Sequence, residues 1–337
     1  MKKFLSILLA LALVLSLGTV AFAEENQDAS FSKTYKIANE GTTNPEETFT
    51  FTFTADRVTD SNNNLTVEDM PDIPDSTVEF SSGAATMTGL EKEVTVALAN
   101  VQWKGVGVYY YKVNEVAGNT AGVIYDDTEA YLKVTVAYNE ARDTYYTAFV
   151  TLNLADENGD GVTDSKTAGF ENVYEAGSLQ ISKKVTGNLG DQDAYFAVDV
   201  TLTGENSKVY LDAYNVAGGS YESNPKTIKI GEKTTFYLKH DETITISNLP
   251  YGVIYTVDEQ DYTTEENGKY DPAAYNFSDD AKKIDSTNDT VTITNNKDLG
   301  TIDTGVFMDS LPYVLLLVGA CAGLVVFFAR RRMTHKG

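Results

Sequence analysis

Apolar and polar positions alternate through most of the chain between residues 29 and 297. The alternating segments are rich in threonine, tyrosine, valine and phenylalanine, which favour pleated strands. They include FTFTFT (49–54), VYYYKVNEV (108–116), YLKVTVAY (131–138) and YYTAFVTLNL (145–154). Turn clusters separate them, among them DSNNN (60–64), DENGDG (156–161) and ENGKYDP (266–272). No long helical period occurs outside the two termini, so the pattern predicts an all-β protein made of β-sandwiches.

The strand segment contains two copies of one plan. In each copy a first strand carries a lysine, a late strand ends in glutamate and the last strand carries an asparagine. The first copy has FSKTYKI (31–37), YYYKVNE (109–115) and FENVY (170–174). The second copy has LQISKKV (179–185), YGVIYTVDE (251–259) and VTITNNK (291–297). The link at 175–178 is short, so we expect two tandem domains, 24–175 and 176–300, stacked end to end.

Strand alternation decides which of these polar side chains point inward, because residues two apart share a face. Lys33 shares its face with Phe31 and Tyr35, and the other members of the plan are likewise in line with apolar neighbours. The inward set is Lys33, Glu115 and Asn172 in the first copy and Lys183, Glu259 and Asn295 in the second. The register alternatives are Lys36, Lys184 and Asn296, which fall on the opposite faces.

The inward lysine, glutamate and asparagine allow two interpretations. One is a buried ion pair with an asparagine hydrogen bond, since a lone buried charge is costly. The other is a self-made isopeptide bond. In an apolar core, desolvation lowers the pKa of lysine and raises that of glutamate. A neutral amine then attacks the asparagine carboxamide, while a protonated glutamate polarises the carbonyl and shuttles protons as ammonia leaves.

Both termini carry apolar runs. The start, MKKFLSILLALALVLSLGTVAFAEEN, has the three parts of a secretory signal peptide, residues 1–23, with cleavage expected after Ala23. Near the other end an uncharged segment, 311–329, is long enough to span a bilayer, and Arg330, Arg331 and Arg332 follow it. We therefore expect an exported chain that a C-terminal helix retains in the membrane.

Charge and cysteine content narrow the class further. Of the 49 acidic residues all but one lie in 24–304, together with 20 of the 26 basic residues. So acidic a region argues against nucleic acid as a partner. The one cysteine, Cys321, falls in the apolar C-terminal run, so the exported part has neither disulfides nor thiolate metal sites. We expect no cofactor.

The residues of the plan, in this order between the two terminal segments, resemble a Gram-positive pilin or related surface protein. The domains look like those of the streptococcal FctA type, which contain isopeptide bonds, within a broader Ig-like, Cna-B-style architecture. This resemblance covers most of residues 29–305. It implies a Lys33–Asn172 bond promoted by Glu115 and a Lys183–Asn295 bond promoted by Glu259.

The segment before the apolar run resembles a cell-wall sorting signal. Such a signal implies that a sortase attacks the carbonyl of Thr304, releases Gly305 and all that follows, and passes the chain to an amine on another subunit or on a peptidoglycan precursor. The usual Leu-Pro-x-Thr-Gly reads Thr-Ile-Asp-Thr-Gly over 301–305, which leaves the identity of the sortase open. The family also suggests Lys166 as the lysine that links subunits, with an ordinary surface lysine as the alternative.

The loop that precedes Lys166 has oxygen-bearing residues at alternate positions. They are Asp156, Asn158, Asp160 and, further on, Asp164. This spacing is similar to that of a calcium-binding loop, but Thr167 occupies the position where glutamate is usual. We therefore prefer a plain hairpin turn and predict no metal site.

The sequence therefore predicts a structural subunit of a covalently assembled pilus, located at the cell surface and cell wall. It is not an enzyme beyond the single turnover of each internal bond. Its predicted partners are sortase, other pilin subunits, peptidoglycan and a host surface ligand. The alternative is a wall-anchored adhesin or binding module that does not polymerise.

Overall fold

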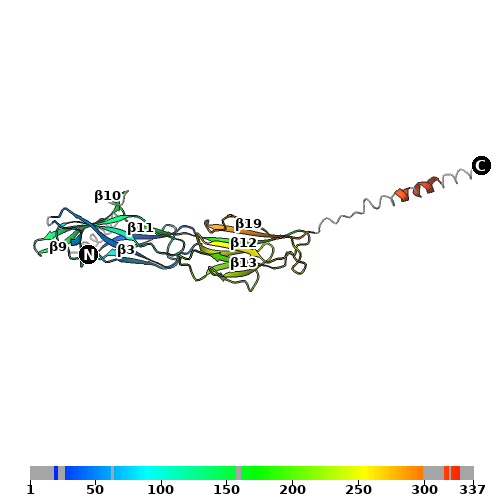
Figure 1. The fold of residues 1–337 in the computed structure, drawn as a ribbon, viewed down its shortest axis with the longest axis horizontal. Helices are drawn as coiled ribbons and strands as arrows, with labels where there is room; N and C mark the ends of the chain where they lie inside the picture. The colour runs from blue at the N-terminus through cyan, green and yellow to red at the C-terminus, as the bar shows by residue number, and fades with distance from the viewer. Residues whose placement is uncertain are drawn as a thin grey trace, which may run out of the picture.

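The computed structural model describes residues 19–21, 27–61, 64–156, 161–298, 315–318 and 320–326. Two β-sheet domains lie end to end along the long axis of the molecule (Figure 1). Strands β3, β9 and β11 belong to the first domain, and β12, β13 and β19 belong to the second. The expectation of an all-β protein is thus confirmed.

The first domain is built from a seven-stranded sheet and a four-stranded sheet. In spatial order the larger sheet consists of β1 (Thr19–Ala21), β9 (Thr144–Ala155), β8 (Ala130–Asn139), β6 (Gly107–Glu115), β3 (Glu47–Thr59) and β4 (Ser76–Phe80), with β10 (Val162–Lys166) also paired to β9. The smaller sheet consists of β5 (Leu90–Val96), β2 (Ala29–Ile37), β11 (Gly169–Tyr174) and β7 (Val123–Ile124). A short 3-10 helix, η1 (Val67–Asp69), lies between β3 and β4.

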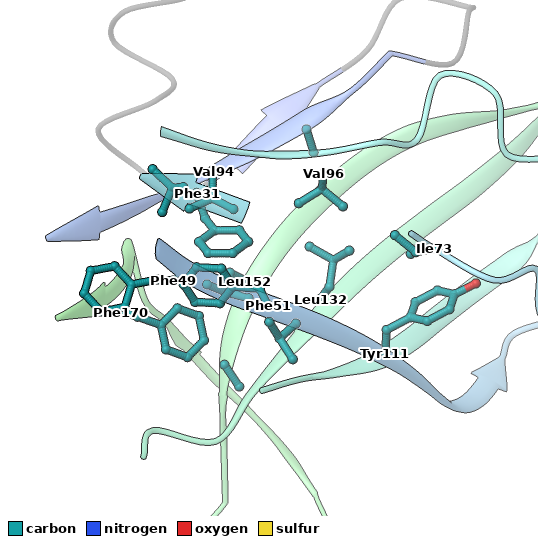
Figure 2. Packing of buried hydrophobic residues seen from close by; sticks show 14 of the residues in the cluster. Phe31, Phe49, Phe51, Ile73, Val94, Val96, Tyr111, Leu132, Leu152 and Phe170 are labelled. Atoms are coloured by element: carbon teal, nitrogen blue, oxygen red, sulfur yellow. The ribbon is translucent and has the colours of Figure 1, made fainter. Parts of the chain in front are cut away.

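The core of this domain lies between the two sheets. Phe31 of β2 and Phe170 of β11 extend from the smaller sheet and meet Phe51 of β3 from the larger one (Figure 2). The ring centroids of Phe31 and Phe51 are 5.0 Å apart in an edge-to-face arrangement. Each alternating strand therefore buries one face against the opposite sheet, as the period of two predicts.

The second domain repeats this construction with fewer strands. Its larger sheet consists of β15 (Thr227–Ile228), β14 (Tyr214–Gly218), β17 (Thr243–Pro250), β12 (Ala176–Thr186), β20 (Asn288–Asn296) and β19 (Ala274–Phe277). Its smaller sheet consists of β16 (Lys233–Leu238), β13 (Phe196–Thr203) and β18 (Ile254–Glu259). Ile181 of β12, Ile293 of β20 and Val200 of β13 are fully buried between these sheets.

In both domains the first and last strands of the plan are neighbours and run parallel. Strand β2 pairs with β11 so that Lys33 lies opposite Phe170. Strand β12 pairs with β20 so that Lys183 lies opposite Ile293. In each pair the asparagine is two residues beyond the partner of the lysine, and hence on the same face of the sheet.

A single residue, Glu175, separates β11 from β12, and its backbone forms hydrogen bonds with both domains. Its N–H donates to the carbonyl of Gly122 over 2.7 Å, and its own carbonyl accepts from the N–H of Tyr251 over 3.0 Å. Two asparagine side chains cross the junction. Asn39 donates to the hydroxyl of Tyr251 at 2.7 Å. Asn248 accepts from the N–H of Thr43 at 2.8 Å and donates to the carbonyl of the same residue at 2.9 Å.

Both predicted terminal segments are described only in part. Strand β1 falls inside the predicted signal peptide and pairs with β9, whereas the predicted cleavage position after Ala23 lies outside the described residues. Residues 315–318 and 320–326 of the predicted membrane segment are helical. Within the described part of the chain, no helix is both long and apolar enough to cross a membrane.

From the hydrogen bonds at the junction we predict that the connection between the two domains is stiff. Replacing Asn39 by Ala and Asn248 by Gly, which keeps the positive φ of 62° accessible at residue 248, removes the hydrogen bonds that these two side chains make across it. Each such bond contributes about 0.5–1.5 kcal/mol. We expect the double variant to broaden the distribution of spin-label distances between the domains while both domains stay folded. Asn100→Ala, at an exposed side chain, is the control, and an unchanged distribution in the double variant would refute the assignment.

Candidate functional site

The first site lies between the sheets of the first domain, where the inward lysine, glutamate and asparagine meet. The side chains of Lys33 and Glu115 are fully buried, and the ammonium Nζ is 2.5 Å from Oε2 of the carboxylate. Nδ2 of Asn172 donates to the other carboxylate oxygen, Oε1. Lysine and asparagine come from the parallel strands β2 and β11, and glutamate comes from β6 in the facing sheet. A single carboxylate therefore holds both of the nitrogen groups.

Burial sets the proton affinities of the pair. Desolvation lowers the pKa of the Lys33 ammonium, and the nearby carboxylate of Glu115 opposes this shift. Desolvation likewise raises the pKa of Glu115, against the opposing effect of Lys33. Both shifts favour the uncharged amine and the uncharged acid. Phe49 lies beside the lysine, with its ring centroid 4.6 Å from Nζ.

The second site has the same composition in the second domain. Nζ of Lys183 is 2.6 Å from Oε1 of Glu259, and both side chains are almost completely inaccessible to solvent. Asn295 is 1% exposed, and a hydrogen bond from its side chain opposes the rise in the pKa of Glu259. Desolvation lowers the pKa of Lys183 and raises that of Glu259. Phe196 takes the place that Phe49 has in the first domain, with Nζ 4.3 Å from its ring centroid.

The register alternatives lie outside these sites. Lys36 forms a partly exposed ion pair with Glu171. Lys184 is exposed, and Asn296 donates to the carboxylate of Asp271 near the surface. The six residues that strand alternation placed inward thus form two groups of three, one in each domain. Lys36, Lys184 and Asn296, which alternation placed outward, lie outside both groups.

Two features of the first site were not apparent in the sequence. The carboxylate of Glu115 contacts the amide nitrogen of Asn172, whereas we expected it to polarise the carbonyl. The carbonyl oxygen Oδ1 instead accepts a hydrogen bond of 2.7 Å from the backbone N–H of Asp126. A backbone donor has no side-chain signature, so no spacing rule identifies it.

The remaining predicted residues are less completely described. Lys166 is exposed at the end of β10, where it lies opposite Asn153 of β9. Thr304 and Gly305 lie outside the described residues, as do 157–160 of the possible calcium loop. Among the residues whose positions are described, no group of three or more histidine, cysteine, aspartate or glutamate side chains is placed to hold a metal ion.

Family comparisons divide the chain at the same junction as the sheets. Residues 29–175 match the FctA family, described as a Spy0128-like isopeptide containing domain. Residues 177–297 match a family described only as a domain of unknown function, DUF7601. The first site therefore lies within the residues that match a family described by its isopeptide, and the second site rests on geometry alone.

Individual relatives come from streptococcal pili. A pilin of Streptococcus pyogenes serotype M1 is 29% identical over 248 residues, which cover 69% of this chain and 70% of the pilin. The pilus tip adhesin Cpa of Streptococcus pyogenes is 30% identical over 125 residues, but these are 36% of this chain and only 17% of the adhesin. The solved structure of the major pilin protein T3.2 from Streptococcus pyogenes is similar in fold, with a TM-score of 0.56, 23% identity and coverage of 83% of this chain and 100% of that one.

The buried pair predicts a strongly non-additive pair of substitutions. In an Asn172→Ala background, which lacks the carboxamide, Glu115→Leu leaves Lys33 buried without its counter-charge. We expect the free energy of unfolding to fall by about 3–5 kcal/mol. Adding Lys33→Met replaces the stranded charge with an apolar side chain and should restore most of this loss. Urea unfolding followed by the fluorescence of Trp103, the single tryptophan and a buried residue of this domain, measures both effects. A further loss on adding Lys33→Met would contradict the prediction.

Proposed function

We propose, from the membership of residues 29–175 in the FctA family and the homology of the chain to the streptococcal pilin, that this protein is a structural subunit of a covalently assembled Gram-positive pilus. Each domain is assigned to the Ig-like, Cna-B-style class of sandwich and carries one internal Lys–Asn isopeptide bond. The observation that carries this proposal is the burial, in each domain, of a lysine and an asparagine from two paired strands beside one glutamate of the facing sheet.

The chemistry proceeds by proton transfer through the glutamate. The Lys33 ammonium gives a proton to Glu115, and the neutral amine attacks Cγ of Asn172, which moves the carbonyl electron pair onto Oδ1. The acid then protonates Nδ2 and takes back a proton from the attacking nitrogen. The carbonyl re-forms as the C–Nδ2 bond breaks, so ammonia leaves and Glu115 remains in its acid form. The contact of Glu115 with both nitrogens suits this shuttle.

Each bond closes a long loop in the unfolded chain. By the chain-entropy relation used for disulfides, loops from residue 33 to 172 and from 183 to 295 correspond to a stabilisation of about 5 kcal/mol each. The exported region contains no cysteine, so this gain is available without an oxidising environment. Bonds of this kind suit a surface protein exposed to proteases and shear.

Assembly of the proposed pilus uses the segments at both ends of the chain. In this proposal the signal peptide (1–23) directs export, and the apolar segment (311–329) with its arginines retains the chain in the membrane. A sortase then cleaves between Thr304 and Gly305. The acyl group passes to Lys166 of another subunit or, at the base of the fibre, to peptidoglycan. The exposed position of Lys166 on β10 supports this choice of lysine.

A non-polymerising wall-anchored adhesin is the second candidate. The observation in its favour is the similarity to the pilus tip adhesin Cpa. That similarity covers about a third of this chain, whereas the similarity to the pilin covers more than two thirds. The pilin assignment is therefore preferred, and a host surface ligand is proposed only for the adhesin case.

Replacing either glutamate should prevent only the isopeptide bond of its own site. We expect Glu115→Ala to abolish the Lys33–Asn172 bond alone and Glu259→Ala to abolish the Lys183–Asn295 bond alone, because each carboxyl serves one site. Proteolysis of residues 24–304 followed by mass spectrometry identifies each bond as a branched peptide lighter by about 17 Da than the sum of its two arms. Glu79→Ala, at an exposed glutamate, is the control. Branched peptides from both sites in the Glu115→Ala chain would disprove the role of that residue.

Polymerisation makes a different prediction. Cell-wall extracts should contain a covalent ladder of multimers that resists boiling in detergent. Lys166→Ala should reduce the ladder to monomers, because the variant lacks the attacking amine. Lys226→Ala, at another exposed lysine, should leave it intact. A ladder that persists in Lys166→Ala would exclude this lysine, and a wall-linked monomer with no ladder in the unmodified chain would favour the adhesin.

A further inference from the structure

The carboxamide of Asn172 is held at both of its polar atoms. Its nitrogen contacts Glu115, and its oxygen Oδ1 accepts the N–H of Asp126 at 2.7 Å. Asp126 follows β7, whose pairing with β11 through Ile124 and Val173 brings the loop alongside Asn172. The N–H therefore points at the one atom of the site on which negative charge develops when an amine adds to the carboxamide.

The side chain of Asp126 fixes this loop in place. Its Oδ1 accepts the N–H of Thr128 at 2.8 Å, which closes a local turn. Its Oδ2 accepts the N–H of Glu171 at 2.6 Å, and Glu171 immediately precedes Asn172 on β11. One carboxylate thus ties the loop to the strand that carries the reacting carboxamide, and it sets the position of its own backbone N–H relative to Oδ1.

The second domain has no such donor among the residues that the structure describes. Oδ1 of Asn295 is buried and has no hydrogen-bond partner there. A pocket of about 200 Å³ lies beside it, with Glu259, Tyr262 and Tyr275 among its lining residues. The two sites therefore share lysine, glutamate and asparagine but differ in what faces the carbonyl oxygen.

We propose that the backbone N–H of Asp126 acts as an oxyanion donor for isopeptide formation in the first domain, and that the Asp126 carboxylate is the positioning group that holds it there. This inference rests on the proposed function, since it concerns the rate of the same bond. When Nζ of Lys33 adds to Cγ, the electron pair displaced onto Oδ1 is stabilised by a donor already in place. Donors at this distance stabilise a developing oxyanion without reorganisation, and losing one typically slows a reaction by about 100- to 1000-fold.

The rate of bond formation tests this assignment. Chains of residues 24–304 are made in a short pulse of cell-free translation, chased, and stopped in denaturant at intervals, and branched peptides from both sites are quantified. Asp126→Ala keeps the N–H but releases the loop, so we expect the Lys33–Asn172 bond to form at least about tenfold more slowly. The Lys183–Asn295 bond in the same molecules should form at its normal rate. Asp126→Asn retains one acceptor oxygen and should recover part of the rate.

Two controls separate this role from a general effect on folding. Asp127→Ala removes the same charge from the adjacent, exposed residue and should leave both rates unchanged. Trp103 fluorescence reports whether the first domain is folded during the chase. If Asp126→Ala does not reach native fluorescence, Asp126→Asn provides the test instead. The formation rates of the two bonds are then compared in that variant.

The outcomes are distinct. Slow formation of the first bond alone, in a folded first domain, supports the assignment. Formation at the unmodified rate in a folded Asp126 variant overturns it and leaves the proposed function intact. A folded first domain that gives no branched peptide even in the unmodified chain overturns the isopeptide proposal itself, and this inference with it.

Discussion

The structure depends on the placement of a lysine where water cannot reach it. The side chains of Lys33 and Lys183 are inaccessible to solvent, and each forms an ion pair with a buried glutamate within a mainly apolar core. Isolated, such a charge would cost several kcal/mol. The sandwich compensates by fixing a glutamate from the facing sheet against the ammonium. The same desolvation that makes the pair costly also favours its neutral forms, and these are the reactive ones.

Because the first and last strands of each domain pair in parallel, a bond between them affects how the domain bears tension. With Lys166 and Thr304 as the linked residues, tension enters the first domain just before β11 and passes directly through Glu175 into β12. In the second domain it enters at the start of β12 and leaves at the end of β20. A bond from Lys183 to Asn295 then carries tension between these strands without loading the rest of the sheet. In the proposed subunit, a bond from Lys33 to Asn172 would lie largely off this path and would keep β11 attached to β2.

The sequence predicted the site better than its surroundings. Side-chain alternation is local, so the inward faces of Lys33, Asn172 and Lys183 followed from neighbouring apolar residues, and the outward Lys36 was separated for the same reason. The oxyanion donor at Asp126 was missed because it is a backbone group that a distant loop delivers. The hydrogen bond between Asn39 and Tyr251 was equally hidden, since it joins residues far apart in the chain and in different domains. Sequence periodicity describes faces of strands, whereas such contacts depend on how loops are placed.

The central claim is that the buried groups react without any other protein, and the intact mass of residues 24–304 tests it most directly. Each isopeptide bond removes one ammonia, so the purified chain, made in the absence of sortase, should be lighter than its sequence mass by about 34 Da. A folded chain whose mass equals that of its sequence would contradict the account and leave only two buried ion pairs.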